Sequence, residues 1–225
     1  MRRTKALRRA ALAAVATALA ISAWLHPGPA GDTQIAAAAP QNTDLTTLLS
    51  QVRVVDRIDD VPGYQRSCKK TMACVFGPAW NDRNDHSGCD TRSRLISISL
   101  RDVEYKLGTR NCKPISGTLE PDPYTGQVID LKSVEIDHIY ALSRAWNAGA
   151  WQWSLEQRQS FANDFDELIA VSKAANRDKS SGGLDDWMPI YQPCVYAVRY
   201  VTVAVKYNLP ITTGDRATAI TACNN

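Results

Sequence analysis

The fold is decided by Val134-Glu-Ile-Asp-His138, Leu168-Ile-Ala-Val171 and Ala175-Asn-Arg-Asp-Lys179. The first stretch begins as a strand, the second is a short apolar run that predicts another strand, and the third is polar and leads toward a helix. Neighbouring side chains of a strand point to opposite faces, so Asp137 and His138 can face one centre only where the first strand ends or twists. The predicted order is a strand, an Asp-His pair at its end, an insertion, a second strand and an Asn-Arg-x-Lys approach to a helix.

The side chains in these stretches are those that phosphodiester hydrolysis requires. Asp137 offers a carboxylate oxygen and Asn176 an amide oxygen, which suit one hard divalent cation. His138 offers a general base whose ordinary pKa, about 6.5, leaves it neutral at pH 7. Activity is therefore expected to fall as the pH drops through that value. Arg177 and Lys179 offer positive charge to phosphate groups.

The same stretches resemble the HNH endonucleases, which have the ββα-metal fold, and more narrowly the GmrSD-type group, which includes small secreted bacterial nucleases. The similarity extends over about residues 70–223. Further segments that carry it are Gly77-Pro-Ala-Trp80, Cys89-Asp-Thr-Arg92, Asp122-Pro-Tyr-Thr-Gly126, Ala145-Trp-Asn-Ala-Gly149, Phe161-Ala-Asn163, Trp187-Met-Pro189 and the tail from Tyr191 to Cys223. An Asp-His dipeptide alone has little specificity, whereas this ordered set is a strong signal.

The resemblance implies a role for each matching residue. His138 corresponds to the general base that deprotonates water. Asp137 and Asn176 correspond to the ligands of a single ion, Mg²⁺ or Mn²⁺. Arg177 and Lys179 correspond to positions on the phosphate side of the site. The implied reaction is hydrolysis of DNA, with RNA as a second candidate substrate, and its products carry 5′ phosphates.

Glu167 and Arg92 each have two alternative roles. The HNH pattern has an asparagine nine residues before the position of Asn176, where it braces the loop that carries the base; this chain has Glu167 there. A carboxylate accepts hydrogen bonds from backbone N–H groups but cannot donate as an amide does. Glu167 is therefore expected either to brace the loop in an altered way or to lie near the metal. Arg92 is expected to contact a phosphate, with a loop brace as the alternative.

The N-terminus has the pattern of a secretory signal peptide. Five basic residues precede an uncharged, Ala-rich stretch of about 15 residues from Ala10 to Trp24, which is short for a membrane span, and small residues follow it. Cleavage is expected within residues 36–39, with a site near Ala30 or an uncleaved anchor as alternatives. Residues 1–39 are therefore predicted to direct secretion, after which the protein has no stable membrane association.

The net charge of the protein changes sign when the predicted signal peptide is left out of the count. The whole chain has 26 basic and 23 acidic residues, a formal charge of +3. Residues 1–39 hold five of the basic residues and one of the acidic ones, so the remainder has 21 against 22, a charge of −1. A nucleic-acid partner must therefore be held by a local patch and not by the overall charge.

All six cysteines follow residue 39, and an even number in an exported chain predicts disulfides. Chain order favours the pairs Cys68–Cys74, Cys89–Cys112 and Cys194–Cys223, although six cysteines allow other connectivities. A structural zinc site is the alternative. It is disfavoured because the chain has no CxxC pair and only His86 and His138 lie beyond residue 39.

Periodicity and turn residues predict the remaining elements. Strands are expected at residues 95–100, 102–107, 112–119 and 127–131, and helices at 43–55, 154–163, 184–187, 194–207 and 213–223. Ser154 and Gln157 form a predicted capping box, and Thr213 is the predicted cap of the last helix.

The sequence thus predicts a monomeric α+β protein with a single disulfide-braced domain. Residues 40–66 are expected to form an N-terminal segment with one helix. Residues 67–225 are expected to form the nuclease domain, with an N-terminal β region, the HNH core and two C-terminal helices clamped by a disulfide. The alternative is an inactive HNH fold that binds nucleic acid, or a secreted structural protein whose disulfides are its main feature.

Overall fold

The computed structural model describes residues 45–224, and the predicted signal peptide at residues 1–39 lies outside this range. The helices are α1 (Leu45–Gln51), α2 (Thr91–Ser99), α3 (Leu142–Asn147), α4 (Leu155–Asn163), α5 (Lys173–Lys179), α6 (Pro193–Lys206) and α7 (Thr213–Cys223), with the 3-10 turns η1 (Leu131–Ser133) and η2 (Ala150–Gln152). The strands are β1 (Val54–Val55), β2 (Arg101–Tyr105), β3 (Pro114–Leu119), β4 (Ile129–Asp130), β5 (Val134–His138), β6 (Leu168–Ser172) and β7 (Ile211–Thr212). The protein is a mixed α+β fold, as predicted.

The described strands form three small sheets. β2, β3 and β4 make an antiparallel meander, β1 pairs in parallel with β7, and β5 pairs antiparallel with β6. The segment between β5 and β6 holds α3, η2 and α4, and α5 follows β6 directly. Strand, insertion, strand and helix therefore occur in the order that the sequence predicts.

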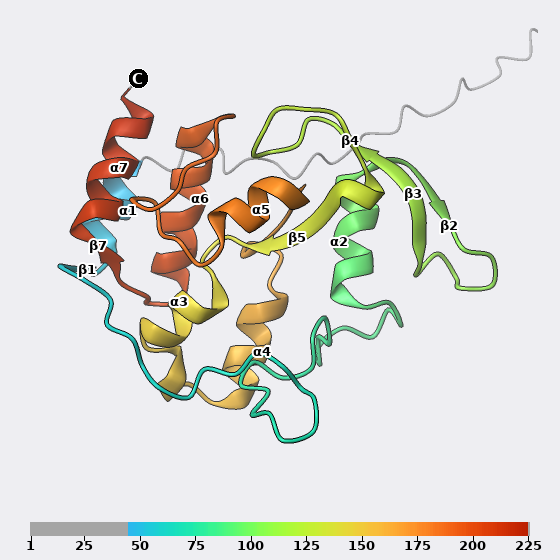
Figure 1. Ribbon diagram of the computed structural model, residues 1–225, viewed down its shortest axis with the longest axis horizontal. Helices are drawn as coiled ribbons and strands as arrows, with labels where there is room; N and C mark the ends of the chain where they lie inside the picture. The colour runs from blue at the N-terminus through green and yellow to red at the C-terminus, as the bar shows by residue number, and fades with distance from the viewer. Residues whose placement is uncertain (1–44, 225) are drawn as a thin grey trace, which may run out of the picture. The chain divides into compact units, whose positions relative to one another are not determined.

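The two faces of the β5–β6 pair contact different parts of the core. Ile136 and Ala170 are paired across the strands and pack in one apolar cluster with residues of α2. Ile169 and Val171 point the other way, into the larger cluster that includes α6. Figure 1 shows β5 lying between α2 and α5. The alternation of strand side chains thus separates an α2 face from an α5 face.

Residues 95–99 form part of α2 and Leu100 is its C-cap, so the strand predicted at residues 95–100 is wrong. Asp90 caps the helix by accepting a hydrogen bond of 2.6 Å from the Ser93 backbone N–H. Leu95 and Ile96 are buried, with Thr91 one turn before them. The alternation of apolar residues with serine suggested a strand, but the cap and the burial of one helical face outweigh it.

The polar stretch before residue 180 is itself a helix, α5, and no helix forms at residues 184–187. Ser172 ends β6 and caps α5 by accepting from the Ala175 N–H. The cap of α7 is likewise one residue earlier than predicted, because Thr212 and Asp215 form a capping box there. The predicted capping box of Ser154 and Gln157 is present at α4.

Three disulfides brace the described residues, and no described cysteine is free. The bonds join Cys68 to Cys74, Cys89 to Cys112 and Cys194 to Cys223, the pairs favoured by chain order. The third bond ties the first turn of α6 to the end of α7. None of the helices in residues 45–224 has the length and apolar character needed to cross a membrane.

Candidate active site

Asp137 and His138 are the last two residues of β5 and point to opposite faces of the strand pair. Asp137 lies on the α5 face, where Lys179 contacts its carboxylate. His138 lies on the α2 face, where its ring stacks on Trp80 with centroids 5.9 Å apart. The strand ends at His138, and both residues line one open pocket at this end. The strand end therefore allows two opposite-facing side chains to border a common space.

One nitrogen of the His138 ring is held by the backbone of α4. Nε2 lies 3.1 Å from the Ala162 carbonyl oxygen. A carbonyl oxygen only accepts, so Nε2 carries the proton that this hydrogen bond needs. Nδ1 of the neutral ring is then left without a proton, and its lone pair is free to act as a base.

Burial lowers the pKa of His138 to about 3. The hydrogen bond to Ala162 acts in the opposite direction, while the positive charges of Arg66 and Lys179 lower the pKa further. The imidazole is therefore neutral well below pH 6.5. Protonation of this ring therefore occurs at a lower pH than for an ordinary histidine.

The Asp137 carboxylate is buried and fully engaged. Lys179 Nζ lies 2.9 Å from Oδ2 and donates to Oδ1 at 3.1 Å, and the Tyr124 hydroxyl donates to Oδ2 at 2.5 Å. Burial raises the pKa of Asp137, and the ammonium of Lys179 and the hydroxyl of Tyr124 oppose that rise. The Asp137 carboxylate is thus surrounded by polar protein groups, one of which is the positively charged ammonium of Lys179.

Lys179 does not have the exposed, phosphate-facing position expected from the sequence. Its side chain is fully buried, and its ammonium also donates to the His138 carbonyl oxygen at 2.9 Å. A buried ammonium needs a paired negative charge, and Asp137 provides it. Lys179 therefore holds the end of β5 against α5 and does not face the solvent.

Asn176 lies one turn before Lys179 on α5 and contacts Glu135, two residues before Asp137. Its Nδ2 donates to Glu135 Oε2 at 3.0 Å. Arg177 pairs with the other oxygen of Glu135 at 3.5 Å and is largely exposed. Glu135 and Asp137 share the face of β5 that packs against α5. Asn176 therefore belongs to the α5 side of this contact and Asp137 to the β5 side. Glu135 was not identified from the sequence.

Glu167 is fully buried and lies directly behind the His138 loop. Its Oε2 accepts from the Tyr140 N–H at 3.1 Å, and its own carbonyl accepts from Ile139 at 2.9 Å. Oε1 has no hydrogen-bond partner among residues 45–224. Burial raises the pKa of Glu167 well above its usual range, although Tyr140 and Lys179 act against this rise. The carboxyl group is thus placed where it can hold the chain that follows His138.

The pocket at the end of β5 has a volume of about 370 Å³. Besides Asp137 and His138 it is lined by Tyr64, Arg66, Ala141, Leu142, Ser143, Ser180 and Ser181. Asn176, Arg177 and Arg92 are not among its lining residues; Arg92 is a partly exposed residue of α2. The sequence offered no signal for Tyr64 and Arg66, because they lie about 70 residues before Asp137 in an irregular segment.

The contact between α5 and β5 contains oxygen atoms of the types that a hard divalent cation takes as ligands. These atoms are the carboxylate oxygens of Asp137 and Glu135 and the Asn176 amide oxygen, which accepts no hydrogen bond from residues 45–224. Mg²⁺ and Mn²⁺ prefer such ligands. Within residues 45–224 no three His, Cys, Asp or Glu side chains gather into a metal cage. An ion here would therefore have few protein ligands and be completed by water or substrate oxygens.

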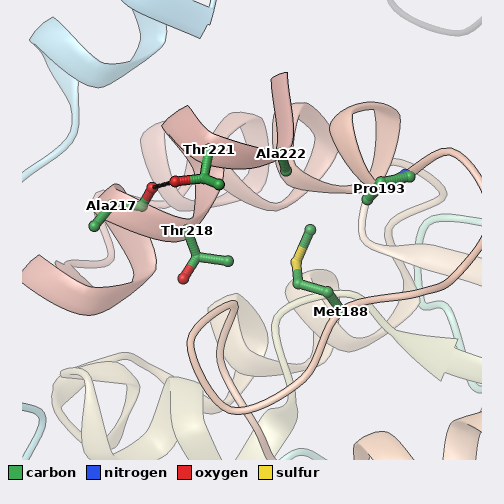
Figure 2. A pocket seen from close by; sticks show the side chains of 6 residues that line it. All are labelled: Met188, Pro193, Ala217, Thr218, Thr221 and Ala222. Atoms are coloured by element: carbon green, nitrogen blue, oxygen red, sulfur yellow. Dashed lines mark hydrogen bonds between the residues drawn. The ribbon is translucent and has the colours of Figure 1, made fainter. Parts of the chain in front are cut away.

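A second pocket, of about 290 Å³, lies between α7 and the chain before α6. Figure 2 shows the side chains that line it, with Met188 on one side and Thr218 and Thr221 of α7 on the other. None of its lining residues is titratable. It therefore offers no general base or metal ligand, and the Asp137–His138 pocket is the better candidate for catalysis.

Comparison with known proteins supports a family assignment. Residues 90–221 match the sequence model of the GmrSD restriction endonucleases, C-terminal domain. A protein from the fungus Arthroderma benhamiae, named as an uncharacterized secreted protein, is 34% identical over 142 residues, which cover 61% of this chain and 67% of that relative. No solved structure matches the chain. The range matched by the family model includes Asp137, His138, Glu167 and Asn176, but it begins at residue 90 and so does not include Arg66.

Proposed function

From the premise that this chain belongs to the family of GmrSD restriction endonuclease C-terminal domains, we propose that it is an exported, metal-dependent endonuclease that hydrolyses DNA phosphodiester bonds. The proposed HNH core is β5, β6 and α5. RNA is the second substrate to be tested. The observation that carries the proposal is the His138 ring, whose Nε2 is tied to Ala162 while the ring borders a polar pocket together with Asp137.

In the proposed reaction His138 Nδ1 accepts a proton from the attacking water. The Ala162 carbonyl keeps the proton on Nε2, and stacking on Trp80 holds the plane of the ring. Glu167 braces the backbone after His138 through the Tyr140 N–H. These contacts fix both the tautomer and the direction of the base, which general-base catalysis requires.

Asp137 and Asn176 are the proposed ligands of one Mg²⁺ or Mn²⁺ ion. When bound, such an ion supplies positive charge that stabilises the negative phosphorane and the leaving oxygen. Lys179 and Tyr124 hold the Asp137 carboxylate in place through direct hydrogen bonds. Lys179 is thus proposed as a positioning residue and not as a substrate contact.

Arg177 and Arg92, which lie outside the pocket, are proposed to contact phosphates that flank the bond to be cleaved. Arg177 is exposed and paired with Glu135 only at 3.5 Å, a surface contact that contributes little. A phosphate would replace that partner at low cost, because exchange of one exposed anion for another leaves the guanidinium solvated.

Export is supported by two observations. The relative in Arthroderma benhamiae is named as a secreted protein, and the three disulfides of this chain suit an oxidising compartment. We propose that residues 1–39 are removed as a signal peptide. The N-terminal sequence of the protein recovered from culture medium would identify the cleavage position.

The test of the proposed function is cleavage of supercoiled plasmid by the purified protein, residues 40–225. Wild type is expected to cut with Mg²⁺ or Mn²⁺ and to stop in EDTA. His138→Ala is expected to reduce the rate by about 10²- to 10⁴-fold, the usual contribution of a general base. His86→Ala is the matched control, because His86 lies exposed in a loop and is expected to leave the rate unchanged.

Full activity of His138→Ala would overturn the proposed base. A wild-type protein that binds DNA but never cuts it would favour the alternative, an inactive binding module. One observation agrees with that alternative: both carboxylate oxygens of Asp137 are already engaged by protein groups. Binding of Mn²⁺ by calorimetry, compared between wild type and Asp137→Asn, separates the two.

A further inference from the structure

Arg66 is a positive side chain in the pocket of the proposed base, and the family match does not include it. It lines the pocket together with Tyr64, Asp137 and His138. Its charge is close enough to His138 to lower the pKa of that ring. The residue therefore lies where a nucleic-acid strand would pass if the proposed function holds.

The guanidinium of Arg66 has spare hydrogen-bonding capacity. Its one hydrogen bond to the described residues goes from Nη1 to the Gly77 carbonyl oxygen at 3.2 Å. Within residues 45–224 no carboxylate lies within ion-pair distance of it, whereas Arg144 pairs with Asp215 and Arg177 with Glu135. A guanidinium carries five N–H donors in a planar fork that matches phosphate oxygens. Arg66 thus has donors and charge that the protein does not use.

The segment around Arg66 is rigidly held. Backbone hydrogen bonds join Cys74 to Ser67 and Val75 to Gln65, and the Cys68–Cys74 disulfide closes the loop between them. On both sides of the loop an aromatic side chain anchors it to the core. Tyr64 makes edge contacts with Phe76 and with Trp146, and Phe76 is fully buried. A pre-positioned arginine loses less entropy on binding an anion than a free surface arginine does.

The pocket offers further donors beside Arg66. Ser143, Ser180 and Ser181 also line it, and their hydroxyl groups have no protein hydrogen-bond partner in the described part of the chain. Three hydroxyls and one guanidinium thus line the same pocket as Asp137 and His138. These neutral and positive donors suit a phosphodiester group.

We propose that Arg66, positioned by the Cys68–Cys74 loop, binds a phosphate of the polynucleotide backbone in the cleavage pocket. This inference rests on the proposed function and assigns part of the substrate site to a segment outside the family domain. It also accounts for affinity in a protein whose charge beyond residue 39 is −1. A local, fixed arginine replaces the overall charge as the source of attraction.

The test is binding of a fluorescein-labelled 20-base-pair DNA duplex by fluorescence anisotropy in EDTA, over a series of salt concentrations. Arg66→Gln is expected to raise Kd by about tenfold or more at low salt, as for loss of a charge-assisted hydrogen bond. It is also expected to reduce the slope of log K against log salt by about 0.9, the value for one duplex phosphate. Arg66→Lys is expected to keep the slope but bind more weakly, because lysine lacks the planar fork.

Arg57→Gln is the matched control, because Arg57 lies in the same N-terminal segment but is exposed and pairs with Asp59. It is expected to change neither Kd nor the slope. Arg66→Met, which keeps the aliphatic stem, replaces Arg66→Gln if circular dichroism shows that the glutamine variant is unfolded. A Kd and slope equal to those of Arg57→Gln would overturn the assignment of Arg66.

Failure of this inference and failure of the proposed function give different results. If wild type cuts plasmid while Arg66→Gln binds as wild type does, only the assignment of Arg66 falls. If wild type binds without cutting and Arg66→Gln binds more weakly, the assignment stands and the proposed catalysis falls. If wild type binds neither DNA nor RNA, both fall.

Discussion

The proton on His138 is controlled by a backbone carbonyl, and this contact determines how the proposed base responds to pH. Nε2 is bound to Ala162, and burial lowers the pKa of the ring to about 3. A base with a lowered pKa stays unprotonated, and so active, to lower pH. An ordinary solvent-exposed histidine would instead lose its lone pair below about pH 6.5.

We therefore expect kcat/KM for plasmid cleavage to stay level from pH 8 down to about pH 5. The measurement uses saturating metal at two concentrations, so that competition between protons and metal is separated from titration of the base. A drop centred near pH 6.5 at both concentrations would contradict the burial of His138 in the working enzyme.

Glu167 is the residue where this chain departs from the HNH pattern, and its burial explains how a carboxyl group serves there. Its pKa is raised chiefly by burial, while Asp137 and Asp164 add to the rise and Lys179 opposes it. An acid with a raised folded-state pKa keeps its proton longer in the folded than in the unfolded protein. The protonated group therefore stabilises the fold fully at a pH below its pKa in the unfolded protein. This stabilisation is lost as the pH rises toward its pKa in the folded protein.

Glu167→Gln removes this titration while keeping an oxygen for the Tyr140 N–H. The stability of the variant relative to wild type is expected to increase by about 1 kcal/mol or more between pH 5 and pH 8. Urea unfolding at the two pH values measures it. Glu156→Gln, at an exposed position on α4, is the control and is expected to show no such trend. A pH-independent difference for Glu167→Gln would mean that the group is ionised in the folded state.

At the scale of elements, the insertion between β5 and β6 serves the site through α4. The capping box of Ser154 and Gln157 starts this helix, and its last turn presents the Ala162 carbonyl to His138. The same helix binds the N-terminal segment, since Arg158 Nε donates to the Val75 carbonyl at 2.5 Å. α4 thus connects the proposed base to the loop that positions Arg66.

The Cys194–Cys223 disulfide joins α6 to α7 across a sequence separation of 29 residues. Replacing both cysteines by serine is expected to lower the free energy of unfolding by about 3–4 kcal/mol, from the chain entropy that the bond removes. Thermal or urea unfolding measures this, and activity at low temperature is expected to be retained because neither helix end lines the pocket.

The Cys68–Cys74 disulfide closes a much shorter loop, because its two cysteines are only 6 residues apart in the sequence. Its double serine variant is expected to lose less stability, about 2 kcal/mol. It is expected to weaken DNA binding, however, because Arg66 is released from its fixed position. Equal binding losses for the two double variants would contradict a specific link between this loop and the substrate.

At the scale of the whole molecule, the site is assembled from segments far apart in the chain. The pocket combines the end of β5, the residues after α5 and a loop about 70 residues before β5. An ion pair between Arg144 and the buried Asp215, at 2.6 Å, joins α3 to α7. Asp215 also accepts from the Leu184 N–H, so the chain after α5 is held by the C-terminal helix. Substitutions in α7 that break these contacts are therefore expected to disturb the site indirectly, although α7 does not line the pocket.

Local sequence signals were sufficient for much of this architecture. Alternating and continuous apolar runs predicted β5 and β6, and Ser154 with Gln157 predicted the start of α4. Where two local signals competed, the sequence alone misled: serine alternation suggested a strand at residues 95–100, but capping by Asp90 and packing on β6 made it helical. The polar helix α5 has no apolar period, and its helical state depends on Ser172 and on burial of Lys179.

The sequence by itself determined the order of strand, Asp-His, insertion, strand and Asn-Arg-x-Lys, because these are short-range patterns of residue type and spacing. It also determined the family and the residue types available to a metal and a base. Only the tertiary structure decided that Lys179 is buried on Asp137, that Glu167 holds the Tyr140 N–H and that Arg66 reaches the pocket. Those facts depend on which distant segments exclude water from which side chain, and burial is a property of the packed chain that no local pattern contains.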